Sequence, residues 1–313
     1  MHEVYVPRIQ HGNAAFTANV LGARGQLLSV LAHFFEHGRW GSLVEIGVGE
    51  QSLIAEDQLF VLMQAALYLT ATRGYSTADM RICHERAESL CRSLNRPLLL
   101  YSALIGQWRY CLMTDKPSVG IKIAERVYSL SQEQNDAALT VGVYASLAAN
   151  LFLLGDFESA RQYAMRGVQI WRSGGVQSSA EEYYTPAVGC LVYLAMSEWH
   201  FGEIASGQAT MAEAISLAKE LNDANALAYA LSWAASLACC ERNRAEVDRL
   251  ASGLVELCTR HAFVHWLAIG AVWRGWARSA CGDAVEGIPW IERGIKDCWA
   301  CRVFSHVRLK HYI

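Results

Sequence analysis

Apolar residues recur along most of this 313-residue chain at the three- to four-residue spacing of amphipathic helices. The apolar stretches come in pairs, and none shows the sustained alternation that is typical of strands. Between the members of a pair, a helix-stopping residue is followed by a helix-start signal, at Gly38, Gly74, Asp115, Gly155, Gly202, Asn243 and Gly282. The intervals are 36, 41, 40, 47, 41 and 39 residues. The pattern predicts an all-α fold, an α–α solenoid of about seven helical hairpins.

Internal repetition supports this prediction. The segments 85–95 and 125–135 share five of eleven positions, and 216–224 resembles 129–137. The one long interval contains the polar segment 173–186, which we interpret as a loop insertion. Small residues are expected five positions beyond each turn, where paired helices approach closely. Counted from the second turn onward, these positions are Asp79, Gly120, Ala160, Gly207, Asp248 and Gly287. The two aspartates predict hairpins that are looser or shifted in register.

The repeat resembles the tetratricopeptide repeat over about residues 57–297, most clearly in 147–168. Four segments, 73–91, 154–171, 226–235 and 275–295, are similar to the helical-repeat regions of large bacterial signal-transduction ATPases, which are linked to adenylate-cyclase-like domains or are of the LuxR and maltose-regulator type. The sequence contains no G-x-x-x-x-G-K-[ST] motif, so it offers no phosphate-binding loop. The resemblance therefore implies the sensory or scaffolding arm of such a protein without its ATPase module.

We expect one solenoid domain over residues 1–299. Residues 300–313 are more basic and lack a helical period, which predicts an atypical tail that is disordered or truncated.

In tetratricopeptide repeats, certain first-helix positions face the concave groove. Counted from the turns, these positions hold an apolar, aromatic-rich set: Gln64, Tyr68, Ile105, Arg109, Phe152, Met196, Trp199, Trp233 and Trp276. Such a surface would suit the anchoring of a protein or peptide. The alternative is that some of these aromatic side chains pack between helices instead.

Composition narrows the range of partners. The net charge is −3 and Lys/Arg-rich runs are absent before the last dozen residues, so neither nucleic acid nor an anionic membrane is expected as a partner. The apolar stretches 137–154 and 224–240 are interpreted as buried solenoid helices, not as membrane spans. No secretory signal is recognisable at the start. Ten cysteines without a paired framework then predict reduced core thiols in a cytoplasmic protein.

Four short motifs suggest other chemistry, and each has a plainer interpretation. His33, Glu36 and His37 match the H-x-x-E-H metalloprotease pattern, but Gly38 ends the helix and no third ligand follows. The segment 43–49 is similar to a methyltransferase glycine motif, but no βαβ pattern follows it. Cys258, His261 and His265 would share a helix face only if no loop interrupts them, and Cys298 with Cys301 forms a lone C-x-x-C.

The sequence therefore predicts a non-catalytic, protein- or peptide-binding module of bacterial signalling, with no cofactor, no metal site and no catalytic residue. The alternative is a domain that closes around a small-molecule effector. A metalloenzyme or a methyltransferase comes third.

Overall fold

The computed structural model describes residues 55–73, 75–114, 116–174 and 185–300. By its internal contacts the chain divides into two units, Met1–Ile54 and Ala55–Ile313, and every described helix belongs to the second. The described part is entirely helical, which confirms the predicted fold class.

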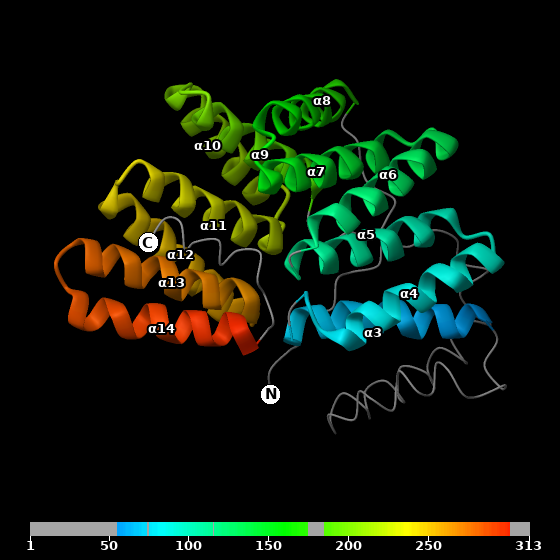
Figure 1. Cartoon of the computed structure of the whole chain (residues 1–313), viewed down its shortest axis with the longest axis horizontal. Coiled ribbons are helices and arrows are strands. Elements are labelled where there is room, and N and C mark those ends of the chain that lie inside the picture. The colour runs from blue at the N-terminus through cyan, green and yellow to red at the C-terminus, as the bar shows by residue number, and fades with distance from the viewer. Residues whose placement is uncertain (1–54, 74, 115, 175–184, 301–313) are drawn as a thin grey trace. The chain divides into compact units, whose positions relative to one another are not determined.

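The helices form six consecutive hairpins (Figure 1). Their bounds are α3 (Ala55–Arg73) with α4 (Ala78–Ser93), α5 (Pro97–Met113) with α6 (Pro117–Gln134), α7 (Ala137–Leu154) with α8 (Phe157–Gly174), α9 (Pro186–His200) with α10 (Ile204–Glu220), α11 (Ala224–Cys240) with α12 (Arg244–His261), and α13 (Val264–Ala280) with α14 (Ala284–Ala300). The predicted first hairpin, around Gly38, lies outside the described residues. So do the turn positions Gly74 and Asp115.

In the last four hairpins, the turn between the paired helices contains a left-handed residue. Gly155, Gly202 and Gly282 have φ of 87°, 82° and 98°, as their positions in the sequence predicted. At the predicted turn Asn243, the left-handed residue is instead Arg242, with φ of 57°. Asn243 is the N-cap of α12, and its side chain accepts a hydrogen bond from the backbone N–H of Glu246 at 3.2 Å.

The repeated Asn residues mark the turns between hairpins. Asn95, Asn135 and Asn222 have φ of 50°, 48° and 53°. Asparagine tolerates this left-handed conformation better than most residues. The aspartate that follows two of them caps the next helix: Asp136 accepts from the N–H of Ala138, and Asp223 accepts from the N–H of Ala226. The sequence similarity between repeats therefore reflects a shared turn.

The small residues past the turns lie where helices meet. A Cβ added to Gly207 would lie 2.8 Å from the carbonyl oxygen of Ala195, and one added to Gly287 would lie 2.6 Å from that of Gly275. In the two exceptional hairpins the contact position is shifted by one residue, because Met80 and Val247 are buried while Asp248 is exposed. Val247 lies five residues beyond the left-handed Arg242, as Ala160 lies five beyond Gly155, so in this hairpin the register is the usual one and the turn had been placed one residue too late.

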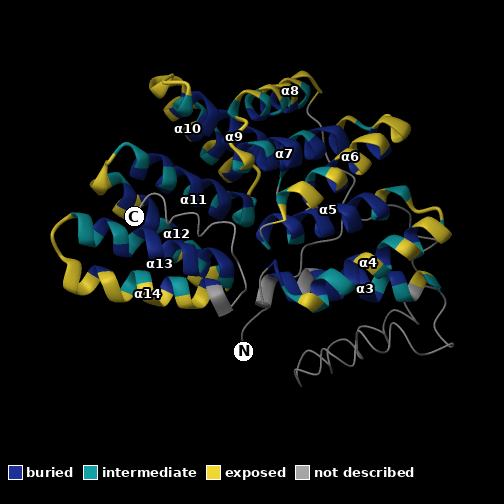
Figure 2. Ribbon diagram, viewed as in Figure 1, coloured by how far each residue is buried: buried dark blue, intermediate teal, exposed yellow. Residues whose placement is uncertain are grey.

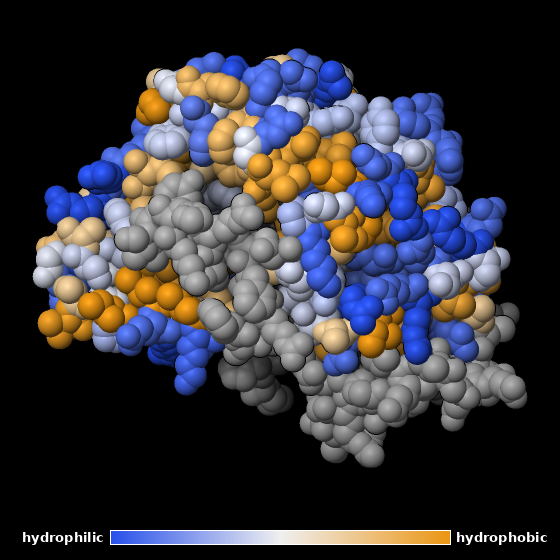
Figure 3. All heavy atoms as spheres, viewed as in Figure 1, coloured by the Kyte–Doolittle hydropathy of each residue, from blue (hydrophilic) through white to orange (hydrophobic). Residues whose placement is uncertain are grey.

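The first helices of the hairpins form the inner layer. Helices α5, α7, α9, α11 and α13 are buried along most of their length, whereas their partners bury one face and expose the other (Figure 2). Hydrophilic side chains cover much of the visible surface over α4 and α6 (Figure 3). The inner layer is apolar because it is enclosed by protein on nearly all sides.

The stretch 137–154 is helix α7 and 224–240 is helix α11, as predicted. Within the described residues, α7 is the one helix long and apolar enough to cross a membrane, and 72% of it is buried. Its neighbours α6, α8 and α9 cover it. This is the position of a core helix.

The solenoid also makes a contact that closes it. Helix α13 of the sixth described hairpin packs against α3 of the first. The inner faces of hairpins far apart in sequence are thereby brought together.

Candidate functional site

Most of the predicted groove residues are buried. Ile105, Arg109, Phe152, Met196 and Trp233 keep between 2% and 9% of their surface exposed. Gln64, Trp199 and Trp276 are half-buried, and the side chain of Tyr68 lies outside what the structure describes. The inner face is therefore largely closed, and its role in binding remains a prediction.

Two of these residues meet in an aromatic cluster. The rings of Phe152 and Trp233 lie edge to face, with centroids 5.9 Å apart. Tyr193 contacts both rings, at 5.6 Å and 5.4 Å. Phe152 also contacts His200 edge to face at 5.3 Å, which extends the cluster to the end of α9. Arg109 belongs to a second cluster of buried side chains.

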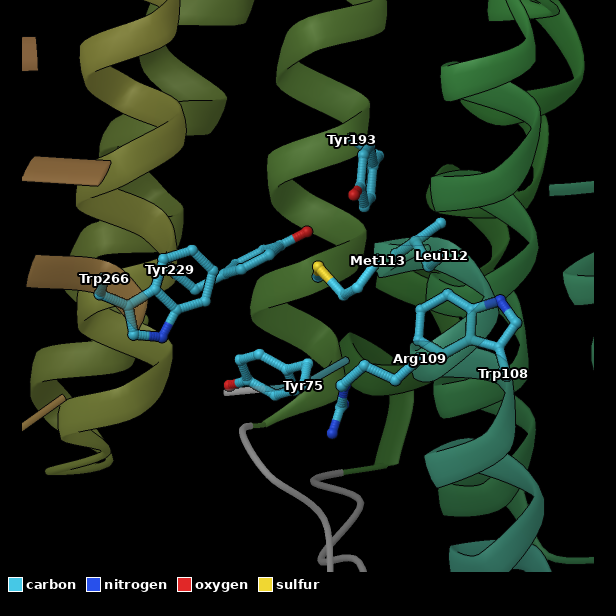
Figure 4. A pocket seen from close by; sticks show the side chains of 8 residues that line it. All are labelled: Tyr75, Trp108, Arg109, Leu112, Met113, Tyr193, Tyr229 and Trp266. Carbon is cyan, nitrogen blue, oxygen red and sulfur yellow. The ribbon is translucent and has the colours of Figure 1, made fainter. Parts of the chain in front are cut away.

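That second cluster surrounds a small cavity (Figure 4). Its walls come from α5, α9, α11, α13 and the turn before α4, and the lining residues are Tyr75, Trp108, Arg109, Leu112, Met113, Tyr193, Tyr229 and Trp266. The space that the centre of a water-sized sphere can reach is about 10 Å³. This is room for about one water molecule and not for a small-molecule ligand.

Tyr75 joins the walls of this cavity. Its ring contacts His265 edge to face at 5.0 Å and Trp266 at 6.3 Å, and the guanidinium carbon of Arg109 lies 5.5 Å from its centroid. The hydroxyl hydrogen-bonds with Asn225 and Trp266. Trp266 Nε1 also donates to Asn225 Oδ1 at 2.8 Å. Tyr75 therefore connects the first described hairpin to the second, fifth and sixth.

Burial controls the charges near this site. Desolvation raises the pKa of the Tyr75 phenol, although the positive charge of Arg109 and the hydrogen bond with Asn225 oppose the rise. His84 of α4 is fully buried, and desolvation together with the charge of Arg109 lowers its pKa to about 4. The phenol and the imidazole are thus both neutral near pH 7.

Seven of the eight residues that line the cavity were not predicted from the sequence: Tyr75, Trp108, Leu112, Met113, Tyr193, Tyr229 and Trp266. Counting from the turns selected one or two positions per helix. Tyr193 and Tyr229 lie one helical turn before Met196 and Trp233, so the next inner position along each helix would have found them. Tyr75 lies in a turn, where helix periodicity gives no signal.

The cysteines in the described residues are free thiols, and most are buried. Burial raises the pKa of Cys83, Cys239 and Cys258 to about 12, and that of Cys91 and Cys240 to about 11. Such thiols are protonated near neutral pH and unreactive. Cys281 is exposed.

The alternative motifs are only partly within the described residues. The left-handed residue Ala262 ends α12 between His261 and His265, so the three soft ligands do not share one helix. No group of three metal-ligating side chains occurs among the described residues. Cys298 is buried in α14, whereas Cys301, the H-x-x-E-H motif at 33–37 and the glycine segment 43–49 lie outside the described part.

Comparison with known proteins identifies similar folds. A family model described as anaphase-promoting complex subunit 5 matches residues 163–241, and no curated protein matches the chain. A Rap protein complexed with competence and sporulation factor has a TM-score of 0.63 at 12% identity, covering 88% of this chain and 78% of that one. The apo form of RapI gives 0.58 at 10% identity, covering 91% and 96%. BtubC from P. vanneervenii gives 0.51 at 14%, covering 79% and 93%. The fold is a tetratricopeptide-like solenoid.

Proposed function

We propose that this chain is a non-catalytic binding scaffold, whose partner is a protein or peptide held by the inner face of the solenoid. The observation that carries the proposal is the concentration of aromatic side chains on that face: Phe152, Tyr193, Tyr229, Trp233 and Trp266. Large rings with a polar edge anchor partners at low entropic cost.

The inner face holds few groups suited to catalysis. Arg109 is a buried cation on this face, and desolvation keeps two titratable groups near it, Tyr75 and His84, neutral. The buried His265 packs against the ring of Tyr75. A general acid or base needs a pKa near the working pH and an open position for substrate. This chemistry favours recognition over turnover.

The comparisons support a macromolecular partner. One similar structure is a Rap protein complexed with competence and sporulation factor, and the matching family model describes a subunit of the anaphase-promoting complex. The resemblance of 73–91 and 275–295 to repeat regions of bacterial signalling ATPases suggests a regulatory, cytoplasmic arm of such a system. A small-molecule effector is less favoured, because the cavity has room for about one water molecule.

Affinity capture from cells tests the proposal. The wild-type chain is compared with Trp199→Ala, Trp233→Leu and the outer-surface control Tyr128→Ala, whose side chain is 37% exposed. We expect partners recovered by the wild type and the control to fall at least about tenfold with either tryptophan variant, the usual loss at an aromatic anchor. Equal recovery by all four folded proteins would refute binding at the inner face.

A further inference from the structure

We propose that Tyr75 is a built-in occupant of the inner site, and that the partner displaces it by presenting a tyrosine side chain of its own. This inference rests on the proposed function, because it names the chemistry by which the inner face recognises a partner.

The inner site has almost no free volume for a partner's side chain. The cavity beside Tyr75 has room for about one water molecule, and the surrounding side chains are nine-tenths buried or more. A side chain of a partner can enter only where a resident side chain leaves. The contact between α3 and α13 must loosen at the same time, since it joins the same two hairpins as the contacts of Tyr75 with His265 and Trp266.

Tyr75 is the lining residue that can leave the cavity wall. Tyr75 belongs to the turn between α3 and α4, whereas the other lining residues lie within helices. Moving Tyr75 outward leaves the backbone hydrogen bonds within α5, α9, α11 and α13 in place, but moving Tyr229 or Trp266 would disturb α11 or α13. In the view of Figure 4, Tyr75 lies between Trp266 and Arg109.

The groups around Tyr75 determine what would bind in the recess that its side chain vacates. Arg109 lies over the ring face, His265 meets its edge, and Asn225 with the indole N–H of Trp266 meets its hydroxyl. These groups recognise an electron-rich ring with a hydroxyl at its far end. A phenylalanine would leave the amide N–H of Asn225 without that hydroxyl, which costs binding energy in a buried site, whereas the indole N–H of Trp266 keeps its bond to Asn225 Oδ1. The recess therefore selects tyrosine.

The probe N-acetyltyrosinamide tests the recess without any partner. We measure its binding to the full chain by NMR and by shift of the melting temperature, in the wild type and in Tyr75→Ala. We expect saturable binding to Tyr75→Ala and at least about tenfold weaker binding to the wild type, whose recess is filled. N-acetylphenylalaninamide should bind Tyr75→Ala about five- to tenfold more weakly, because it lacks the hydroxyl. Addition of Asn225→Ala should reduce that difference, because it removes one of the two groups that meet the hydroxyl.

Equal binding of the two probes to Tyr75→Ala, or equal binding of the tyrosine probe to wild type and variant, would overturn the proposal. If Tyr75→Ala does not fold, the single variant Asn225→Ala tests the proposal instead. Tyr75 loses one hydrogen bond in that variant, so its nitration by tetranitromethane should become several-fold faster than in the wild type. An unchanged nitration rate would equally contradict a displaceable Tyr75. Because no partner takes part, failure here leaves the proposed function standing. Conversely, failure of affinity capture leaves the recess intact.

Discussion

At the scale of single residues, this protein buries polar groups with little compensation. The ring of His84 packs directly against Gly106, where an added Cβ would come within 2.2 Å of it. Its Nδ1 has no hydrogen-bond partner within the described structure. The charge of Arg109 and the desolvation act in the same direction, so protonating His84 in the folded state is strongly unfavourable.

The free energy of unfolding should therefore fall with acidification. The pKa of His84 is 6.5 in the unfolded chain and about 4 in the folded protein. Between these pH values the unfolded state binds more protons, so stability is complete above pH 6.5 and decreases by up to about 3 kcal/mol as the pH approaches 4. Urea unfolding at pH 5 and pH 7 should show this decrease in the wild type. His84→Gln should show less of it, and an identical pH dependence would contradict the role of His84.

The residues of the inner face were only partly predictable from the sequence. Arg109, Phe152 and Trp233 were found by counting from the turns, because the helical period fixes which side chains face inward. Tyr75 could not be found in this way. Its position depends on contacts with α5, α11 and α13, which lie up to 190 residues away in the sequence.

At the scale of elements, close approach of paired helices depends on glycine at specific positions. Gly207 faces the backbone of α9, where the carbonyl oxygen of Ala195 leaves no space for a methyl group. The hydrophobic pattern predicted this contact, since it recurs five residues after the turn. The register change expected at Asp248 is instead a misplaced turn, because the buried Val247 keeps the five-residue spacing from the left-handed Arg242. The one-residue error at Asn243 arose because an N-cap asparagine and a left-handed asparagine look alike in sequence.

A pair of glycine substitutions separates packing from helix propensity. Gly207→Ala should lower the free energy of unfolding by about 1–3 kcal/mol, because α10 must move away from α9. Gly253→Ala in α12 is the matched control, since an added Cβ there meets nothing within 4 Å. It should raise stability by up to about 1 kcal/mol through helix propensity. Thermal and urea unfolding measure both changes, and a stabilising Gly207→Ala would refute the close contact.

At the scale of the whole molecule, the solenoid is closed where α13 meets α3. The sequence predicted hairpins in series but not this closure. The reason is that small rotations between successive hairpins accumulate over the whole array, and no local pattern records their sum. The closure explains why a face predicted as a groove is instead mostly buried.

Distances between spin labels should report the closure. Labels are placed at the exposed residues Ala78 and Arg260, after replacement of Cys281 and Cys301 by serine. The buried thiols with raised pKa values should remain unlabelled. We expect one narrow distance distribution in the wild type and a longer, broader one in Tyr75→Ala. Superimposable distributions would mean that Tyr75 does not hold α3 and α13 together.

The central claim, that the inner face contacts the partner, is tested most directly by site-specific photocrosslinking in cells. A photoreactive phenylalanine analogue replaces Tyr229 on the inner face in one variant and Tyr128 on the outer surface in another. Both substitutions preserve an aromatic ring, so the two variants differ in which surface the crosslinker samples. We predict a discrete crosslinked partner at position 229 and none at position 128. A partner that crosslinks at 128 but not at 229 would contradict binding through the inner face.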